Sequence, residues 1–125
     1  MIGNVVVFNA TLRFCCKDIV RNKYAMTELL RTACDIAGFR IRRIVEEDYR
    51  KPKGAKTLVA FLNESHAIVT TYPENKTIEL EIAGCKNFNY EALCIWLREK
   101  QQVTEMRYFA MEKDALGNWT GLRNI

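Results

Sequence analysis

Four short extended segments follow one another in the middle of the chain, and this run constrains the fold more than any other feature of the sequence. Each segment alternates apolar and polar residues or is rich in β-branched ones, and they cover about residues 39–47, 56–63, 66–72 and 77–84. Short turn-like stretches separate them at 51–54, 64–65 and 73–76. Adjacent strands joined by such short turns pair antiparallel. The sequence therefore predicts an antiparallel meander.

Further elements flank the meander on both sides. Residues 4–14 read as a first strand, and apolar residues at helical spacing predict a helix over about 22–37 that ends at Gly38. A second helix is expected to start at Asn89, a favourable N-cap, and a final strand at about 105–111 precedes an irregular tail. This order predicts the α+β class, as a two-layer α/β sandwich that has an antiparallel sheet with two helices on one face.

A sheet with helices on one face only leaves its other face exposed or covered by a partner. We expect the partner to be the sheet of a second copy of the chain, hence a homo-oligomer, with a dimer as the first expectation. The length of 125 residues suffices for one core and not for two ordinary ones, so residues 1–125 are expected to form a single domain.

Composition and charge exclude several functional classes. The apolar runs are far shorter than a membrane span of roughly 20 residues, and no basic segment followed by an apolar stretch opens the chain. The five cysteines form no regular framework and no CxxC pair, which indicates a reducing, cytoplasmic location and no metal site. The net charge is +4, and acidic residues 46–48 separate the two basic clusters, so neither nucleic-acid nor membrane binding is expected.

Three polar residues, Glu64, Ser65 and His66, stand between two apolar segments of the meander. Taken alone, Ser65 is a strand-end hydroxyl, and Cys85, twenty residues later, is a buried structural cysteine. Their spacing, together with the Thr-Tyr-Pro-Glu stretch that ends at Glu74, resembles that of the prokaryotic S-adenosylmethionine decarboxylase family. The resemblance covers most of the chain, including both predicted helices and the segments between them.

The resemblance implies that the chain cuts itself between Glu64 and Ser65 and that Ser65 becomes a pyruvoyl group, which is the family's cofactor. This ketone accepts the electron pair that is released when S-adenosylmethionine loses carbon dioxide. The product is the decarboxylated aminopropyl donor of polyamine biosynthesis. By the same resemblance, Cys85 is the general acid that returns a proton to the α-carbon of the substrate.

Other positions also match the family's pattern. Thr57 corresponds to a hydroxyl residue that assists the cleavage, and Glu74 corresponds to the carboxylate that holds the ribose hydroxyls of the substrate. Tyr49 falls close to the aromatic residue that stacks on adenine, and His66 matches the histidine beside the cleavage point. The resemblance thus implies a site built from the meander and the turns between its strands.

Thr70 departs from the pattern, because the family has a histidine there that serves as a base in the elimination step. A threonine does not titrate near neutral pH. Three alternatives follow: an uncleaved relative that binds or degrades S-adenosylmethionine by other chemistry, an arginine or ornithine decarboxylase, and a non-catalytic regulatory subunit. In an uncleaved chain, Glu64 is a candidate general base or a ligand for the cationic sulfonium. Strict alternation also places Ser65 and Thr70 on opposite sheet faces, so only a kink or bulge would let them share a site.

Overall fold

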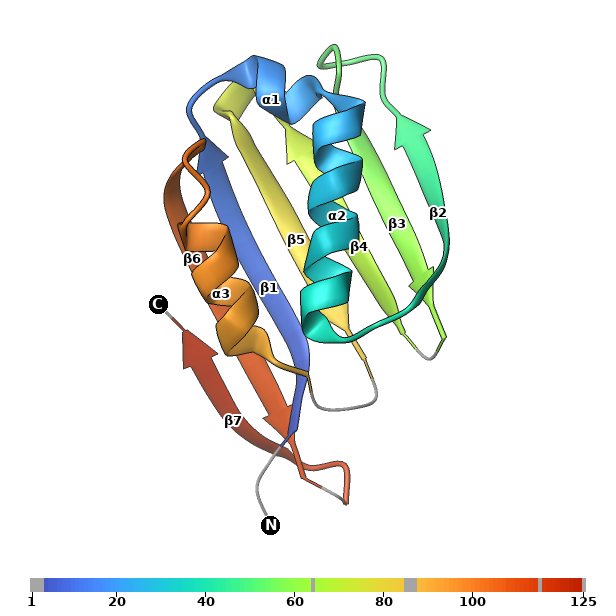
Figure 1. Ribbon diagram of the computed structural model, residues 1–125, viewed down its shortest axis with the longest axis vertical. Helices are drawn as coiled ribbons and strands as arrows, with labels where there is room; N and C mark the ends of the chain where they lie inside the picture. Colours follow the sequence, from blue (N-terminus) through green and yellow to red (C-terminus); the bar gives the residue numbers. More distant parts are fainter. Residues whose placement is uncertain (1–3, 64, 85–87, 115, 125) are drawn as a thin grey trace.

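The computed structural model describes residues 4–63, 65–84, 88–114 and 116–124 of the chain. Seven strands form one antiparallel sheet: β1 (Asn4–Phe14), β2 (Ile41–Asp48), β3 (Lys56–Leu62), β4 (His66–Tyr72), β5 (Thr77–Ala83), β6 (Val103–Lys113) and β7 (Trp119–Asn124). Their order across the sheet is β2-β3-β4-β5-β1-β6-β7 (Figure 1). The four central segments thus form the predicted meander, and β1 and β6 continue it.

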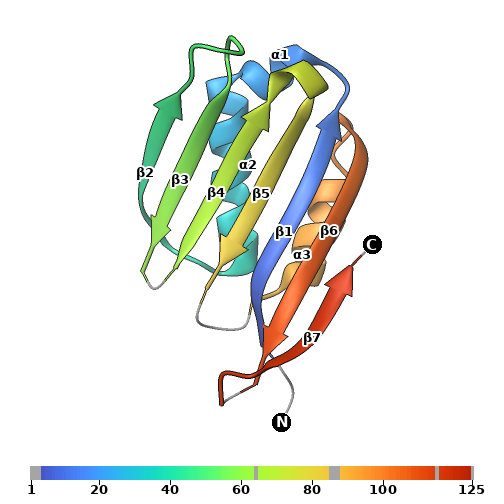
Figure 2. The ribbon, with the colours of Figure 1, turned by 180° about the vertical axis from the view of Figure 1, so that it is seen from behind.

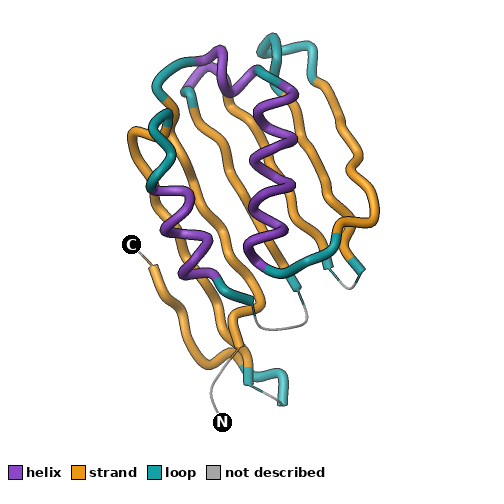
Figure 3. Tube along the Cα trace, in the orientation of Figure 1, coloured by secondary structure: helices purple, strands orange, loops and turns teal. Residues whose placement is uncertain are grey.

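The helices all lie on one side of this sheet. They are α1 (Lys17–Arg21), α2 (Lys23–Ala37) and α3 (Tyr90–Arg98). Figure 2 shows the opposite side, which we call the outer face and which none of these three helices covers. Figure 3 shows the same division into a helix layer and a strand layer. The predicted fold class, an antiparallel sheet with helices on one face, is therefore confirmed.

Two elements go beyond what the sequence pattern predicts. α1 has only five residues, too few to show a helical repeat. The tail, expected to be irregular, contains β7, which pairs with β6 after a tight turn. The Asp114 carboxylate holds this turn by accepting the backbone N–H groups of Leu116 and Asn118 at 2.9 and 3.0 Å. The strand is thus fixed by its partner strand and by the turn, and its own sequence carries little periodic signal.

Helix α2 starts and ends where its sequence predicts. The side chain of Asn22 accepts the N–H of Ala25 at 2.9 Å, and Gly38 ends the helix in the left-handed region at φ 86°. Its buried residues recur at helical spacing and face the sheet: Met26, Leu29, Leu30, Ala33, Cys34 and Ala37. Asn89 caps α3 in the same way, by accepting the N–H of Ala92 at 3.1 Å.

The core lies between the helices and the inner face of the sheet. Alternate strand residues fill this core. Those from β1, β3, β4 and β5 are Phe8, Ala10, Leu12, Phe14, Leu58, Ala60, Leu62, Ala67, Val69, Ile78, Leu80 and Ile82. The residues between them point to the outer face, where Phe61 and Tyr72 remain 40% and 38% exposed. In the described part of the chain, no helix has the length and apolarity that a membrane crossing requires.

Candidate functional site

Ser65 lies in the tight turn that joins β3 to β4, immediately before β4 begins at His66. The Leu62 N–H donates to the carbonyl oxygen of Ser65 at 2.9 Å, which joins Ser65 to the end of β3. The sequence therefore places a hydroxyl at the end of a central strand pair, as predicted.

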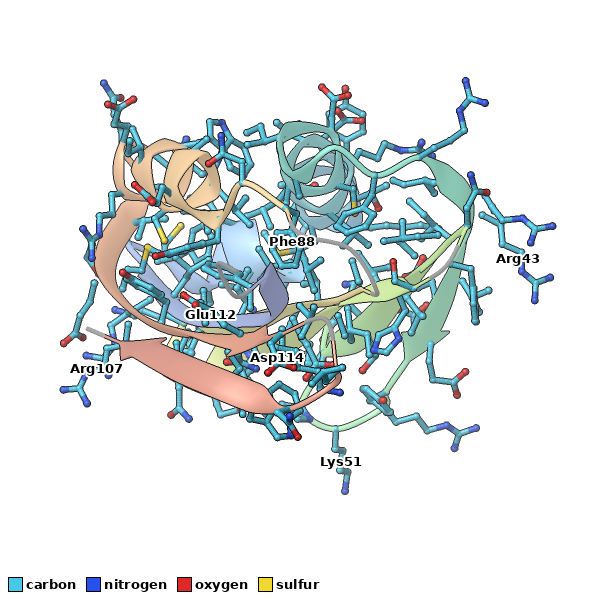
Figure 4. The ribbon with its side chains drawn as sticks, turned by 90° about the horizontal axis from the view of Figure 1, so that it is seen from below. Arg43, Lys51, Phe88, Arg107, Glu112 and Asp114 are labelled. Atoms are coloured by element: carbon cyan, nitrogen blue, oxygen red, sulfur yellow. The ribbon has the colours of Figure 1, made fainter. Side chains whose placement is uncertain are left out.

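The Ser65 hydroxyl points toward the helix side of the sheet and lies near residues from two distant segments. A Cβ atom added at Gly84, just after β5, would lie 3.4 Å from Ser65 Oγ and 2.8 Å from Cζ of Phe39. The Phe39 ring in turn packs edge-on against Phe88, with ring centroids 5.4 Å apart. Figure 4 shows Phe88 between the helix layer and the sheet. We call Ser65, Gly84, Phe39 and Phe88 the Ser65 cluster.

The Ser65 hydroxyl is inaccessible to solvent and has no hydrogen-bond partner within the described residues. Leaving a buried polar group unpaired costs about 1–3 kcal/mol. Such groups are uncommon in native proteins, and a role in chemistry is one of the explanations for them. The unpaired hydroxyl therefore marks Ser65 as a candidate for chemistry.

His66 follows Ser65 directly but points to the outer face. It lies opposite Phe61 on β3 and Ala83 on β5, and its Nε2 is 3.4 Å from the carboxylate of Glu81. The predicted alternation along β4 is thus confirmed, and the two neighbouring side chains serve different faces of the sheet.

A second group of candidate residues lies at the other end of β4 on the outer face. The hydroxyls of Tyr49 and Thr57 are hydrogen-bonded at 2.9 Å, and Thr57 lies directly opposite Thr70 on the neighbouring strand. Tyr72 is the next β4 residue on the same face. We call Tyr49, Thr57, Thr70 and Tyr72 the hydroxyl cluster. Glu74 stands beyond it, exposed on the short 3-10 turn η1 (Pro73–Asn75).

Tyr72 is the member of this cluster that sequence reasoning missed. Burial raises the pKa of its phenol, and the carboxylate of Glu79 on β5 acts in the same direction by its charge and a hydrogen bond. The nearby Tyr49 and Glu74 add smaller contributions of the same sign. The sequence could have predicted Tyr72 as a member of the cluster, because the period of two along β4 places Tyr72 on the same sheet face as Thr70.

The structure does not bring the two groups together within one chain. β4 pairs with β3 and β5 in continuous register from His66 onward, without the bulge that would turn Ser65 and Thr70 to one face. Five residues of extended chain separate them, about 16 Å at 3.3 Å per residue. The predicted site residues therefore form two sets, one at each end of β4.

Two of the predicted residues, Glu64 and Cys85, lie outside the described residues. Gly84 directly precedes Cys85, and its own N–H is fixed by a 2.8 Å bond to the carbonyl oxygen of Val6. Burial raises the pKa of two other thiols, Cys34 to about 12 and Cys94 to about 11. These two cysteines are therefore poor nucleophiles near neutral pH. In the described ranges no group of three His, Cys, Asp or Glu side chains could hold a metal ion.

A second buried hydroxyl lies at the far end of β4 on the inner face. Thr71 Oγ1 accepts the backbone N–H of Lys56 at 2.8 Å and donates to the Lys56 carbonyl at 3.2 Å. The buried ammonium of Lys56 donates to the carbonyl oxygens of Arg21 and Gly54 at 2.9 and 3.0 Å. Both groups are satisfied by backbone atoms, and they tie β3 to β4 and to the end of α1.

Comparison with known proteins gives two findings. The family model described as S-adenosylmethionine decarboxylase matches residues 9–114, so β7 lies beyond it. Among solved structures, the chain is similar to the adenosylmethionine decarboxylase from Aquifex aeolicus, with 15% sequence identity and a TM-score of 0.64. That alignment covers 84% of this chain and 88% of the other and shows a shared fold. The comparison with curated proteins finds no match.

Proposed function

Because the chain belongs to the S-adenosylmethionine decarboxylase family, we propose that it decarboxylates S-adenosylmethionine with a pyruvoyl group made from its own Ser65. The observation that carries this proposal is the Ser65 hydroxyl, which is buried and lacks a hydrogen-bond partner among the described residues. Such a hydroxyl fits a residue that is consumed in chain cleavage better than one that stabilises a turn. The proposed product is the aminopropyl donor of polyamine biosynthesis.

The proposed cleavage needs only residues 64 and 65, a base and water. Ser65 Oγ attacks the carbonyl carbon of Glu64, a C–O bond replaces the peptide C–N bond, and the hydroxyl proton passes to the freed nitrogen. A base then removes the Cα proton of Ser65, and the Cβ–Oγ bond breaks, which releases the upstream chain as a carboxylate. Water finally displaces the nitrogen of the dehydroalanine as ammonia and leaves the ketone.

The Ser65 cluster supplies the surroundings for the resulting group. The pyruvoyl group provides a carbonyl that accepts electrons as the substrate loses carbon dioxide. Phe39 lies near this position, and its ring packs edge-on against the buried Phe88, so the surroundings on this side are apolar and favour a dry site. Cys85, which follows Gly84, is the proposed donor of the proton that the α-carbon gains, a role typically worth about 10² to 10⁴ in rate.

The hydroxyl cluster and Glu74 are the proposed contacts of the nucleoside and sulfonium parts of the substrate. The ring of Tyr49 is 46% exposed and therefore open to stacking by a base. The exposed Glu74 carboxylate can accept hydrogen bonds from ribose hydroxyls. Tyr72 and Glu79 add an aromatic face and a negative charge, which suit a cationic sulfonium.

A second copy of the chain is the proposed partner that unites the two sets of residues. The last residue of β4, Tyr72, is seven residues from Ser65, about 23 Å along extended chain, and Glu74 lies beyond it on η1. Two outer faces packed in opposite directions would bring the hydroxyl cluster of one copy beside the His66 end of β4 in the other. The substrate would then reach Ser65 around the end of the sheet, because the Ser65 hydroxyl faces the helix side. Mixing Ser65→Ala protein with Glu74→Gln protein tests this, because a shared site regains activity that neither variant has alone. Mixed protein that stays inactive, although native mass spectrometry shows hetero-oligomers, would contradict it.

The direct test of the proposed function is release of carbon dioxide from carboxyl-labelled S-adenosylmethionine by the purified protein. The proposal predicts release by the wild type and none by the Ser65→Ala variant. Unlabelled arginine, ornithine and methylthioadenosine serve as competitors, and inhibition by methylthioadenosine alone identifies an adenosyl substrate. Processed wild-type protein that releases no carbon dioxide would refute the proposal.

Thr70 favours a second candidate function, an uncleaved relative that binds or degrades S-adenosylmethionine without a pyruvoyl group. The family's histidine is absent at this position, while Tyr49, Tyr72 and Glu74 remain available for an adenosyl substrate. Equilibrium dialysis with labelled S-adenosylmethionine separates the two functions. The second candidate predicts binding by an uncut chain, with no loss of carbon dioxide and equal behaviour of the Ser65→Ala variant.

A further inference from the structure

The Phe39 ring comes from the short connection between α2 and β2 and lies near Gly84 on the same side as the Ser65 hydroxyl. It directly follows Gly38, the left-handed residue that ends α2, and its N–H donates to the Cys34 carbonyl at 2.9 Å. Its ring is held by the edge contact with Phe88, which is only 5% exposed. The backbone hydrogen bond of Phe39 and the contact with Phe88 thus hold the ring in place.

Gly84 gives this ring the space that it occupies. A Cβ at this position would lie 2.8 and 3.2 Å from Cζ and Cε1 of Phe39, and 3.4 Å from Ser65 Oγ. The backbone cannot simply move away, because the Gly84 N–H is bonded to the carbonyl of Val6 at 2.8 Å. The absence of a side chain at Gly84 therefore leaves a small space that the Phe39 ring and the Ser65 hydroxyl both border.

We propose that Phe39 is a positioning residue for self-cleavage, which it performs only in the space that Gly84 leaves open. This inference rests on the proposed function. The ring helps to keep water away from Ser65 Oγ, which is inaccessible to solvent, and it thereby restricts the orientations that the hydroxyl can take. Restricting a nucleophile in this way accelerates an intramolecular attack, and a dry site strengthens the interactions that guide it.

Variants at the two positions make a pattern that a purely structural role would not give. Phe39→Ala and Gly84→Ala should each slow cleavage by about tenfold to a hundredfold, because a misplacement of about 1 Å has effects of this size. Adding Phe39→Leu to Gly84→Ala removes the clashing ring tip and should raise the cleavage rate about fivefold or more above that of Gly84→Ala alone. Intact-mass spectra over a cell-free synthesis time course give these rates.

Folding is checked in the same variants made with Ser65→Ala, so that all chains stay uncut and their urea midpoints can be compared. Folded variants whose cleavage rates equal that of the wild type would overturn the proposal. A double variant no faster than Gly84→Ala would also overturn it, because the two residues would then act separately.

A second measurement keeps the inference testable if the wild type does not cleave. Ser65→Cys places a thiol at the same site, and peptide mapping after iodoacetamide treatment of uncut native protein reports its access, with the exposed Cys15 as an internal reference. The thiol should react about tenfold or more slowly than Cys15, and Phe39→Ala should remove most of this protection. An uncut wild type refutes the proposed function, whereas labelling that ignores Phe39→Ala refutes the positioning role.

Discussion

Two buried hydroxyls, one at each end of β4, face the helix side of the same sheet and differ in their surroundings. Thr71 accepts one backbone hydrogen bond and donates another, both to Lys56 on the neighbouring strand. Ser65 has no hydrogen-bond partner among the described residues, and its hydroxyl borders the space beside Gly84 that the ring of Phe39 also borders. The Thr71 hydroxyl therefore stabilises the fold through its hydrogen bonds, whereas the buried, unpaired Ser65 hydroxyl lowers the stability of the fold.

This difference shows that a candidate nucleophile can be found by its lack of hydrogen bonds. A satisfied buried hydroxyl is explained by the backbone groups that it serves. An unsatisfied one lowers stability, so its presence needs another reason. In this chain the reason that we propose is cleavage of the peptide bond before Ser65.

The largest effect expected is that of Ser65→Ala, which should abolish both cleavage and release of carbon dioxide. Stability should not fall, because the lost hydroxyl has no partner within the described residues, and it should rise by up to about 1 kcal/mol. Urea unfolding of this variant, compared with Ser65→Cys as an uncut or slowly cut reference, measures the change. A loss of about 2 kcal/mol or more would show that the hydroxyl is structural.

Thr71→Val should have the opposite profile. It leaves the buried N–H and C=O of Lys56 without their side-chain partner, at a cost of about 1–3 kcal/mol in the free energy of unfolding. Unfolding is best measured with Ser65→Ala present, so that only uncut chains are compared, and Thr71→Ser is the control that keeps the hydroxyl. Cleavage in the folded Thr71→Val protein should proceed at the wild-type rate. A strong cleavage defect would erase the distinction between the two hydroxyls.

A smaller effect is expected on the outer face, where the hydroxyl cluster is partly exposed. Tyr49→Phe removes the 2.9 Å hydrogen bond to Thr57, which should lower stability by no more than about 1 kcal/mol. Tyr49→Phe keeps the ring that is proposed to stack on the base and should leave the KM for S-adenosylmethionine nearly unchanged, whereas Tyr49→Leu removes the ring and should raise the KM about tenfold. Tyr24→Leu is the matched control, since this tyrosine is 76% exposed on α2. Equal KM values for Tyr49→Leu and Tyr24→Leu would remove Tyr49 from the site.

The smallest expected effect is on the pH dependence of stability between pH 3 and pH 6. Neither of the two hydroxyls titrates in this range, so the effect comes from carboxyl groups. The ammonium of Lys23, 2.7 Å from the Glu46 carboxylate, lowers the pKa of that carboxyl through a hydrogen bond and its charge. A lowered carboxyl pKa stabilises the fold above the ordinary value and ceases to do so as pH falls through the lowered value. Asp48, whose pKa Glu46 raises, partly offsets this. Urea midpoints should therefore fall less from pH 6 to pH 3 in Lys23→Met than in the exposed control Lys53→Met.

Much of the fold was predictable because its elements carry local signals. The caps at Asn22, Gly38 and Asn89 and the alternation along β3 to β5 fix the helices and the meander where the sequence predicts them. α1 and β7 were missed, since a five-residue helix has no period and β7 depends on its pairing with β6. Local pattern is informative where an element forms its own contacts and weak where a neighbour fixes it.

The sequence predicted where Ser65 lies but not which residues surround it. The turn signal placed Ser65 at a strand end, and strict alternation correctly placed it on the face opposite Thr70. Ser65 and Phe39 are 26 residues apart in the chain and border the same space beside Gly84, which has no side chain; no sequence period reports this proximity. Alternation along β4 does place Tyr72 on the outer face. Its interaction with Glu79 was not predictable in this way, because it depends on the register of β4 and β5.

The central claim is that the unpaired Ser65 hydroxyl cuts the chain, and an intact-mass spectrum of the purified protein tests it most directly. For the wild type we predict two fragments split between Glu64 and Ser65, the second of which begins with a pyruvoyl group, and for Ser65→Ala we predict one uncut mass. A single uncut mass in both samples would contradict self-cleavage at Ser65, because the buried unpaired hydroxyl would then take no part in cutting the chain.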